Sequence, residues 1–203
     1  CFVNRDNSYL ANTYPEKDWA YHDYRNSSIS NYIPAMEYVV KQGGWSIRVG
    51  SLVKEPLPSD LDNHIIDYAV KHRTEKLDLF LISRCRLFVS GNTGLSAIAT
   101  AFDRPCAVVN LIPLSHNDPF RNIDRFIPKS LMTSDDKILT FDEMREIGMF
   151  EKNVGAGFMD FYVKKGISPI ENSPDDIKAL VKEMLEFQNP NAGKRNIYSD
   201  VQS

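Results

Sequence analysis

Residues 86–110 carry the pattern that most restricts how this chain can fold. An apolar run at residues 87–89 ends in a small polar turn, residues 90–94, and a helix-like segment over residues 95–102 follows at once. Pro105 then opens a second apolar run at residues 106–109. This order of strand, tight loop, helix and strand is the unit from which parallel α/β sheets are built.

The loop within this unit lies at the carboxyl end of a strand and the amino end of a helix. Unpaired backbone N–H groups and the positive end of the helix dipole meet there, so an anion such as phosphate is favoured. Gly91 and Gly94 allow close backbone approach, and four polar side chains can donate hydrogen bonds: Ser90, Asn92, Thr93 and Ser96. The loop matches neither Gly-x-Gly-x-x-Gly nor a P-loop with its lysine. A βα turn that needs two glycines for its geometry is the alternative interpretation.

The bulk composition excludes several classes. The chain has 203 residues, 42% hydrophobic and 25% charged, which is ordinary for a globular domain. The net charge of −3 gives no general attraction to nucleic acid or to an anionic membrane, and no apolar run approaches the ~20 residues of a transmembrane segment. The chain begins at Cys1 in what reads as a strand, without initiator Met or signal-peptide layout, so we expect a piece of a longer protein.

Neither the cysteines nor the histidines show metal-ligand spacing. Cys1, Cys85 and Cys106 are widely separated and are interpreted as core thiols in a reducing compartment. The four histidines form no HxxxH or HExxH pattern, so we expect no metal site.

Hydrophobic periodicity predicts alternating strands and helices. We expect strands at residues 1–4, 45–50, 65–68, 87–89, 106–109 and 167–170. Helices are expected at residues 29–42, 74–84, 95–102, 140–147 and 173–187. Residues 7–28 are interpreted as a long loop and residues 111–136 as an irregular excursion over the sheet. The fold class is therefore α/β, with a Rossmann-like, open, mostly parallel sheet and helices on both faces.

Three of the expected helices have a predicted buried face. The 29–42 helix has Ser28 as its N-cap, and its inward residues are Ile33, Met36 and Val40. In the 74–84 helix the inward residues are Leu77, Phe80 and Leu81. The last helix begins at the N-cap Ser173 with Pro174 at its first position, and its inward residues are Ile177, Leu180, Val181 and Met184. Residues 1–187 are predicted to form one α/β domain, and residues 188–203 a frayed polar tail.

Arginines follow two of the predicted strands. Arg5 and Arg48 stand at strand ends, which in a parallel sheet meet the 91–96 loop at the carboxyl edge. Guanidinium groups pair with phosphate oxygens in bidentate fashion, so two of them beside a donor-rich loop suit a diphosphate. A surface arginine or a salt-bridge partner is the alternative for each.

Beyond these patterns, the chain resembles a family of bacterial glycosyltransferases of surface-polysaccharide loci, known mostly from sequence. The matching segments span nearly the whole chain in order, at residues 3–6 with Tyr9, then 21–26, 32–35, 47–50, 91–96, 109–113, 127–129 and 170–172. More distantly, the Arg-Asp strand end and the small polar loop are similar to the donor half of fucosyltransferase-type enzymes. Many relatives have a histidine before the Arg-Asp pair, where this chain has Asn4. A catalytic role of that histidine is either absent here or passes to another group.

The resemblance implies a two-domain GT-B enzyme, of which this chain is the carboxyl-terminal, donor-binding half. It implies a nucleoside-diphosphate sugar as donor, no metal cofactor, and a cell-surface glycan or lipid-linked acceptor held through a missing amino-terminal domain. The protein would then be cytoplasmic or peripheral to the inner membrane. We expect the isolated chain to bind nucleotide weakly and to transfer nothing.

The resemblance also assigns roles to individual residues. Arg5 and Arg48 would hold the phosphates, with Arg25 as a third phosphate or sugar ligand, and the loop would add donors from Asn92, Thr93, Gly94, Leu95 and Ser96. Candidates for the general base are Asp6, His22 and Asp23, because each can accept the proton of an acceptor hydroxyl. His22 can instead be a structural hydrogen-bonding group, and Asp6 can instead orient Arg5. Lys129 and Arg121 are either donor-closing groups or exposed loop charges, and Glu171 is a ribose candidate.

Two other functional classes fit the same features. One is a nucleotide-sugar epimerase of GT-B architecture, which needs a donor sugar and no acceptor. The other is a non-catalytic module that binds a nucleotide or a carbohydrate.

Overall fold

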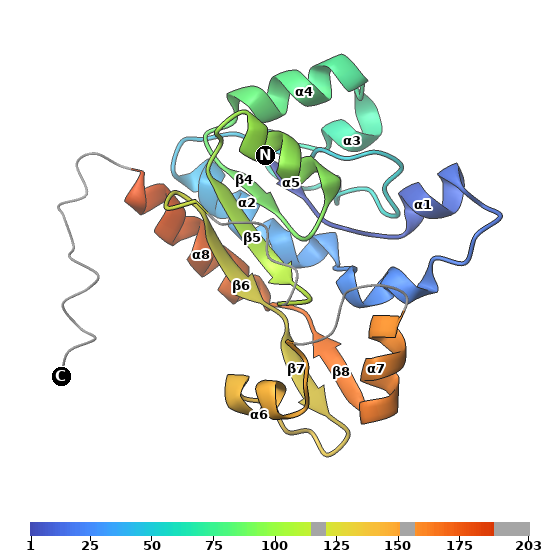
Figure 1. The fold of residues 1–203 in the computed structure, drawn as a ribbon. Coiled ribbons are helices and arrows are strands. Elements are labelled where there is room, and N and C mark those ends of the chain that lie inside the picture. The colour runs from blue at the N-terminus through green and yellow to red at the C-terminus, as the bar shows by residue number, and fades with distance from the viewer. Residues whose placement is uncertain (115–120, 151–156, 189–203) are drawn as a thin grey trace, which may run out of the picture.

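A parallel sheet forms the centre of the computed structural model, which describes residues 1–114, 121–150 and 157–188. Its hydrogen-bonded strands are, in order, β1 (Phe2–Val3), β4 (Phe88–Ser90), β5 (Cys106–Leu111) and β6 (Arg125–Pro128). A second parallel pair, β2 (Ser46–Ile47) and β3 (Ile65–Ile66), joins this sheet, since Arg48 forms a parallel bridge with Phe2. The full order is therefore β3-β2-β1-β4-β5-β6. The predicted open, mostly parallel sheet is confirmed (Figure 1).

Helices cover both faces of the sheet. On one face α2 (Ile33–Lys41) packs against α8 (Pro174–Phe187), and on the other lie α3 (Tyr68–Lys71), α4 (Glu75–Arg84) and α5 (Gly94–Ala101) (Figure 1).

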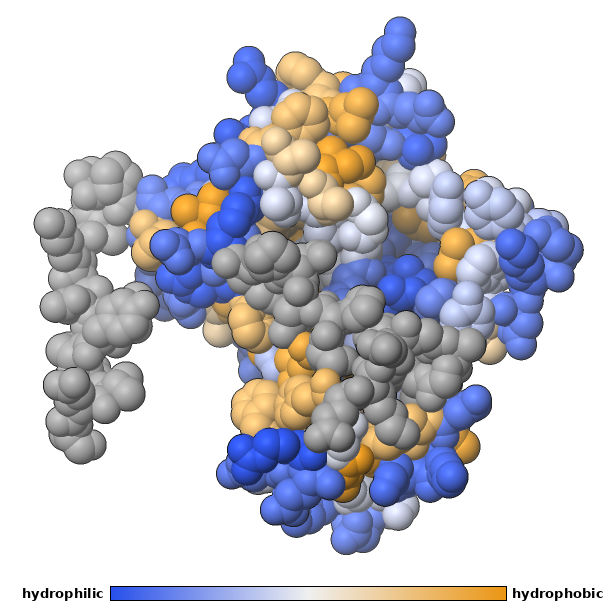
Figure 2. Space-filling view, in the orientation of Figure 1, coloured by the Kyte–Doolittle hydropathy of each residue, from blue (hydrophilic) through white to orange (hydrophobic). Residues whose placement is uncertain are grey.

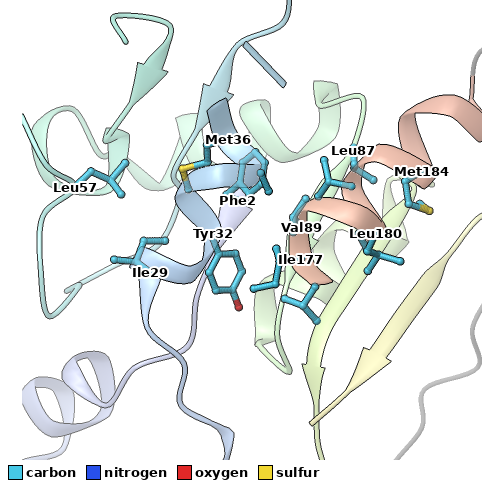
Figure 3. Packing of buried hydrophobic residues seen from close by; sticks show 14 residues of the cluster. Phe2, Ile29, Tyr32, Met36, Leu57, Leu87, Val89, Ile177, Leu180 and Met184 are labelled. Atoms are coloured by element: carbon cyan, nitrogen blue, oxygen red, sulfur yellow. The ribbon is translucent and has the colours of Figure 1, made fainter. Parts of the chain in front are cut away.

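Strand residues alternate between the two cores, as the period of two in a pleated strand requires. Phe2, Val89 and Val109 belong to the core under α2 and α8, which Figure 3 shows from close by. Val3 and Phe88 face the opposite core. The central strands β1, β4 and β5 are thus buried on both sides, which explains their continuous apolar runs in the sequence.

A smaller lobe follows the last strand of the sheet. β7 (Ser130–Thr133) pairs antiparallel with β8 (Ile167–Ile170), and α6 (Phe141–Glu146) and α7 (Gly157–Lys165) complete the lobe (Figure 1). The expectation of an irregular excursion at residues 111–136 is therefore wrong over β6 and β7, whereas residues 115–120 lie outside the described residues. Prolines suggested irregularity, but Pro128 falls at the end of β6, where the strand gives way to the lobe.

The segment at residues 7–28, expected to be a loop, contains two short helices. These are α1 (Ser8–Thr13) and the 3₁₀-helix η1 (Ala20–Arg25). Aromatic packing rather than an apolar periodicity stabilises η1. Trp19 stacks on His22 with the ring centroids 6.0 Å apart, and Tyr24 is buried. A second 3₁₀-helix, η2 (Ile29–Tyr32), begins at the predicted cap Ser28 and leads directly into α2.

The prediction for the buried face of α8 is confirmed, whereas that for α4 holds only for Leu81, which is half-buried against the core. Ser173 and Asp176 form a capping box, and all four predicted inward residues of α8 are buried. In α4, by contrast, Leu77 and Phe80 are 37% and 57% exposed, and the buried residues are Ile82 and Asp78. Asp78 faces inward because Arg73 pairs with it at 3.0 Å. Figure 2 shows the resulting apolar patch on the outer faces of α4 and α5.

Asparagines join the sheet to α8. Asn110, in the left-handed conformation with φ 54°, accepts from the backbone N–H of Asn172 at 2.7 Å and donates its own N–H to the Asn172 side chain at 2.5 Å. Asn172 also donates to the carbonyl of Pro128 at 2.8 Å. The amide pair thus fixes the start of α8 against the carboxyl ends of β5 and β6.

None of the helices in the described ranges has the length and apolar content that a membrane span requires. The predicted polar tail lies outside those ranges from residue 189 onward.

Candidate functional site

The strand order reverses between β1 and β4. From β1 the chain builds outward through β2 and β3, and from β4 it builds the other way through β5 and β6. Val3 pairs with Ser90, so Arg5 and Asn92 each stand two residues beyond that pair on neighbouring strands. In open α/β sheets the crevice at such a reversal, outside the carboxyl ends of the strands, is where ligands bind.

A short segment after η1 crosses this carboxyl edge. The backbone N–H of Ser27 donates to the Arg5 carbonyl at 2.9 Å, and the Asn4 amide donates to the Ser27 carbonyl at 2.9 Å. From the other side, the Lys129 ammonium donates to the Asn26 carbonyl at 2.6 Å. These bonds fasten η1 above the ends of β1 and β6.

Tyr24 anchors η1 to the smaller lobe. Its ring is 5% exposed and meets the Tyr162 ring edge-on, with the centroids 5.9 Å apart. Arg25 follows with its guanidinium carbon 5.8 Å from the centroid of the Tyr24 ring, and its Nη2 lies 2.6 Å from His22 Nδ1. His22 and Arg25 are therefore held in fixed positions beside the end of β1.

Arg5 and Arg25 form a cationic pair. Burial and then the nearby Arg25 charge lower the pKa of Arg5 to about 10, against weaker opposing effects of Tyr24 and of the carboxylates Asp23 and Asp6. Two like charges raise each other's energy in a partly dehydrated setting. Such a pair is normally offset by a carboxylate or by a bound anion.

No carboxylate of the described residues forms an ion pair with either guanidinium. Nε and Nη2 of Arg5 and Nε of Arg25 are buried without a hydrogen-bond partner there. Buried N–H groups of a cation without a partner are costly, on the order of 1–3 kcal/mol or more. A phosphate oxygen supplies both the missing acceptor and the missing negative charge.

His22 is neutral at physiological pH in this setting. Burial, then Arg25 and Arg5, lower its pKa to about 4. A guanidinium only donates hydrogen bonds, so Nδ1 of His22 accepts from Arg25 and the ring proton sits on Nε2. This arrangement makes His22 a weak base and a good hydrogen-bond donor toward an anion.

The two predicted carboxylate bases differ in how far the protein engages them. Asp6 accepts from the backbone N–H of Ser8 at 2.9 Å and of Lys54 at 3.0 Å, one bond to each oxygen. Asp23 is exposed, and Asn7 and Asn26 both donate to the same oxygen, Oδ1. None of the described contacts uses the second oxygen of Asp23, so a ligand can reach it. Of the two carboxylates, Asp23 is therefore the better placed candidate for the base.

The loop at residues 91–96 leaves the start of α5 without a side-chain cap. Thr93 occupies the N-cap position but accepts no hydrogen bond from the helix, while Ser96 donates its hydroxyl to the Thr93 carbonyl at 2.6 Å. A side chain added at Gly94 would meet no described atom within 4 Å. Asn92 turns inward and donates to the Ile112 carbonyl at 3.0 Å. The first N–H groups of α5, which include those of Gly94 and Leu95, are thus open to an anion.

Arg48 lies inside the domain rather than on the open edge. Its side chain is 1% exposed, pairs with Asp67 at 3.6 Å and donates to the Asn4 amide oxygen at 3.3 Å and to the Glu55 carbonyl. The phosphate role predicted for Arg48 remains a prediction. Its contacts indicate instead that it positions Asn4, directly before Arg5.

The sequence interpretation underrated two residues at the edge. Lys129 is 5% exposed and burial lowers its pKa, so the interpretation of this residue as an exposed loop charge is wrong. Glu171 accepts from the Ser28 N–H and from the Asn31 amide, both at 2.9 Å. The signal for Lys129 was its place directly after β6, the same strand-end position that drew attention to Arg5, but residues 125–128 were not recognised as a strand.

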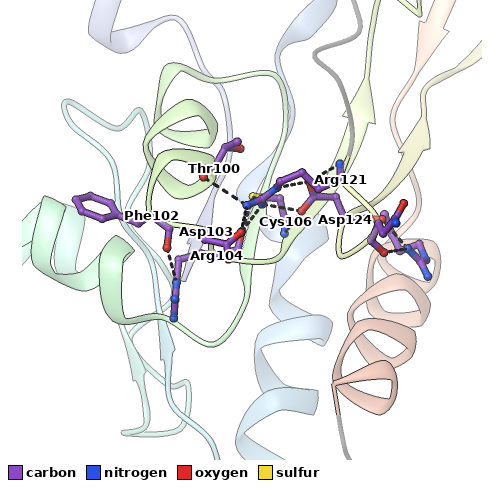
Figure 4. Close-up of polar contacts among 9 residues, drawn as sticks. Thr100, Phe102, Asp103, Arg104, Cys106, Arg121 and Asp124 are labelled. Atoms are coloured by element: carbon purple, nitrogen blue, oxygen red, sulfur yellow. Dashed lines mark hydrogen bonds and ion pairs between the residues drawn. The ribbon is translucent and has the colours of Figure 1, made fainter.

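Arg121 lies at the opposite end of the sheet. It binds Asp124 and Asp103 at 2.8 Å and 2.9 Å, and Asp124 accepts from the N–H of Cys106, the first residue of β5 (Figure 4). Arg121 therefore secures the amino ends of β5 and β6, away from the carboxyl edge.

Comparisons of this chain with protein-family models, with curated proteins and with solved structures give no match. The fold and the carboxyl-edge geometry thus carry the functional argument.

Proposed function

We propose that this α/β domain binds the diphosphate of a nucleoside-diphosphate sugar and acts as the donor-binding part of a glycosyltransferase for a cell-surface glycan acceptor. The observation that carries the proposal is the Arg5–Arg25 pair, two guanidinium groups beside the topological switch point that form no ion pair with a carboxylate of the described residues. The sequence resemblance supports the choice of a nucleotide sugar among diphosphates.

In this proposal the two guanidinium groups and the amino end of α5 hold the phosphates from opposite sides. Arg5 and Arg25 neutralise charge, the first amides of α5 and the hydroxyl of Thr93 donate hydrogen bonds, and His22 donates from Nε2. Fixed donors of this kind stabilise a leaving diphosphate because they need no reorientation as charge develops.

In the proposed transfer step, the hydroxyl group of the acceptor lies near Asp23. The acceptor oxygen bonds to the anomeric carbon, the bond from that carbon to the phosphate oxygen breaks, and the nucleoside diphosphate leaves with the bonding electrons. Asp23 accepts the hydroxyl proton, since its open carboxylate oxygen lies beside the cationic pair. The pKa of His22, about 4, disfavours that residue for the same role.

Isothermal titration calorimetry with GDP, UDP and CMP tests nucleotide binding. Arg5→Ala should lower the affinity for the nucleotide that binds best about tenfold or more, because a charge-assisted hydrogen bond contributes about 1.5–3 kcal/mol. Thr93→Ala should have a smaller effect, because Thr93 supplies one neutral donor. Arg145→Ala, at an exposed arginine on α6, is the matched control and should bind as the wild type does.

Nucleotide binding that is equal in Arg5→Ala and in wild type would contradict the proposal. To separate the transferase from an epimerase, the full-length protein is incubated with the nucleotide sugar alone: an epimerase converts the donor without an acceptor. A non-catalytic module binds nucleotide and turns over neither substrate.

A further inference from the structure

A cleft of about 570 Å³ opens on the β2 side of β1, between the end of β1, α1, η1 and residues 54–55. This volume lies within the ~300–1,000 Å³ of small-ligand sites. Figure 2 shows hydrophilic residues in the hollow between α5 and the α1 limb.

Most of the residues that line the cleft are polar or charged. Asparagine amides, serine hydroxyls and carboxylates predominate, and the apolar members are Ala11 and Ile29. The carbon atoms of the polar side chains are exposed beside their polar groups, so the surface presents both apolar and polar atoms. It offers many hydrogen-bond donors and acceptors at short spacing, which is the chemistry that recognises hydroxyl groups.

The charge of the lining disfavours an anion. Four carboxylates contribute, from Asp6, Asp23, Glu55 and Glu171, against Arg48 and Lys54. Arg48 is already paired with Asp67, so the cleft is acidic in effect. A neutral ligand avoids this repulsion, and carboxylates accept hydrogen bonds from its hydroxyls.

Several acceptors in the wall lack protein partners among the described residues. The amide oxygens of Asn7 and Asn26 are buried without a hydrogen bond. The Glu171 contacts use one carboxylate oxygen, Oε2, and the Asp23 contacts likewise use Oδ1. Small rotations of the two amides would direct their oxygens toward ligand hydroxyls and satisfy them.

The cleft adjoins the cationic pair through the chain itself. Asn4 and Asp6 line the cleft on either side of Arg5, and Asp23 lines it two residues before Arg25. Arg5 and Arg25 themselves do not line the cleft, so the cationic pair and the cleft are two separate sites that adjoin along the chain.

We propose that this cleft binds a neutral, hydroxyl-rich ring of hexose size. The inference deepens the proposed function and partly rests on it, since the ring belongs either to the donor sugar or to the acceptor glycan. Both sources share the chemistry that the cleft recognises.

Saturation-transfer difference NMR with methyl glycosides of glucose, galactose and N-acetylglucosamine tests this on the 203-residue chain. Ala11 is exposed on α1 and lines the cleft, so Ala11→Trp should fill the cleft and abolish the glycoside signals. Tyr9→Trp is the matched control: Tyr9 is 47% exposed on the same helix and does not line the cleft, so the signals should persist.

Pyrophosphate calorimetry on the same variants separates the two proposals. Ala11→Trp should bind pyrophosphate as the wild type does. Arg5→Ala should no longer bind pyrophosphate but should still give the glycoside signals. If pyrophosphate binds through Arg5 but no glycoside gives a signal, or the signals survive in Ala11→Trp, the cleft proposal is overturned and the diphosphate proposal stands. The reverse pattern overturns the diphosphate site alone.

Nucleotide sugars distinguish the source of the ring. If the cleft holds the donor sugar, Ala11→Trp should lower the affinity for a nucleotide sugar about tenfold (about 1.4 kcal/mol) and leave the affinity for the free nucleotide unchanged. If the cleft holds the acceptor, nucleotide and nucleotide sugar should bind this variant equally and only the glycosides should be lost. Either result supports the proposal.

Discussion

At the scale of single residues, the two strand-end arginines have opposite environments. Arg48 is fully enclosed and its charge is matched by Asp67, whereas Arg5 faces another guanidinium and lacks a carboxylate partner among the described residues. Both follow predicted strands, and the sequence alone treats them alike. The difference arises because Asp67, after β3, reaches Arg48, whereas none of the carboxylates in the described part of the chain comes close enough to Arg5 to form an ion pair.

Stability measurements should separate the two arginines. Arg48→Met leaves the buried Asp67 carboxylate without its cation, so we expect the free energy of unfolding to fall by about 3–5 kcal/mol. Arg5→Met removes a repulsion and several unsatisfied N–H groups, so we expect it to leave stability unchanged or to raise it. Urea unfolding of the ligand-free proteins measures both. A loss in Arg5→Met as large as that in Arg48→Met would mean that Arg5 has a partner in the folded protein.

At the scale of elements, the carboxyl edge is assembled by polar contacts between segments distant in sequence. Asn172 links the start of α8 to β5 and β6, and Lys129 links β6 to the segment after η1. Capping signals and apolar periodicity predicted α8 and its buried face because both are local in the sequence. These cross-links carry no local pattern, which is why the sequence did not predict them.

The amide link can be tested by removing one side chain. Asn172→Ala leaves the Asn110 N–H and the Pro128 carbonyl without their partners, at a cost of about 1–3 kcal/mol for each group that stays buried. We therefore expect a clear fall in the midpoint of urea unfolding. Ser168→Ala, at an exposed position in β8, is the control and should change the midpoint little. Equal midpoints for the two variants would show that the amide link does not stabilise the fold.

At the scale of the whole molecule, the sequence predicted the sheet and much of the candidate site at its carboxyl edge. The apolar runs and the 90–94 turn predicted β4, α5 and β5, and the strand-end rule placed Arg5 beside the loop. In the smaller lobe the predictions of α6 and β8 are confirmed, whereas α7 and β7 were missed because they have weak periodicity and depend on a shared core with Ile112 and Tyr24. The pairing of Arg5 with Arg25 followed only from the fold, because Tyr24 holds η1 against that lobe.

The pKa of His22 reports the electrostatic potential at the carboxyl edge, because the His22 ring is close to both guanidinium groups. Burial, and then the repulsion between these charges and a proton on the ring, lower the pKa of His22 from 6.5 to about 4. An anion bound between them would offset their charge and favour the imidazolium form. By linkage, anion binding should then strengthen as the pH falls below about 6.5.

The most direct test is an NMR titration of the His22 ring with and without saturating pyrophosphate, its signals being assigned with His22→Gln. We predict a pKa of about 4 for the free protein and a rise toward the ordinary histidine value when pyrophosphate is bound, with no shift of the His72 signals at the end of α3. If pyrophosphate binds and the His22 pKa stays where it was, the anion lies elsewhere and the cationic pair is not its site.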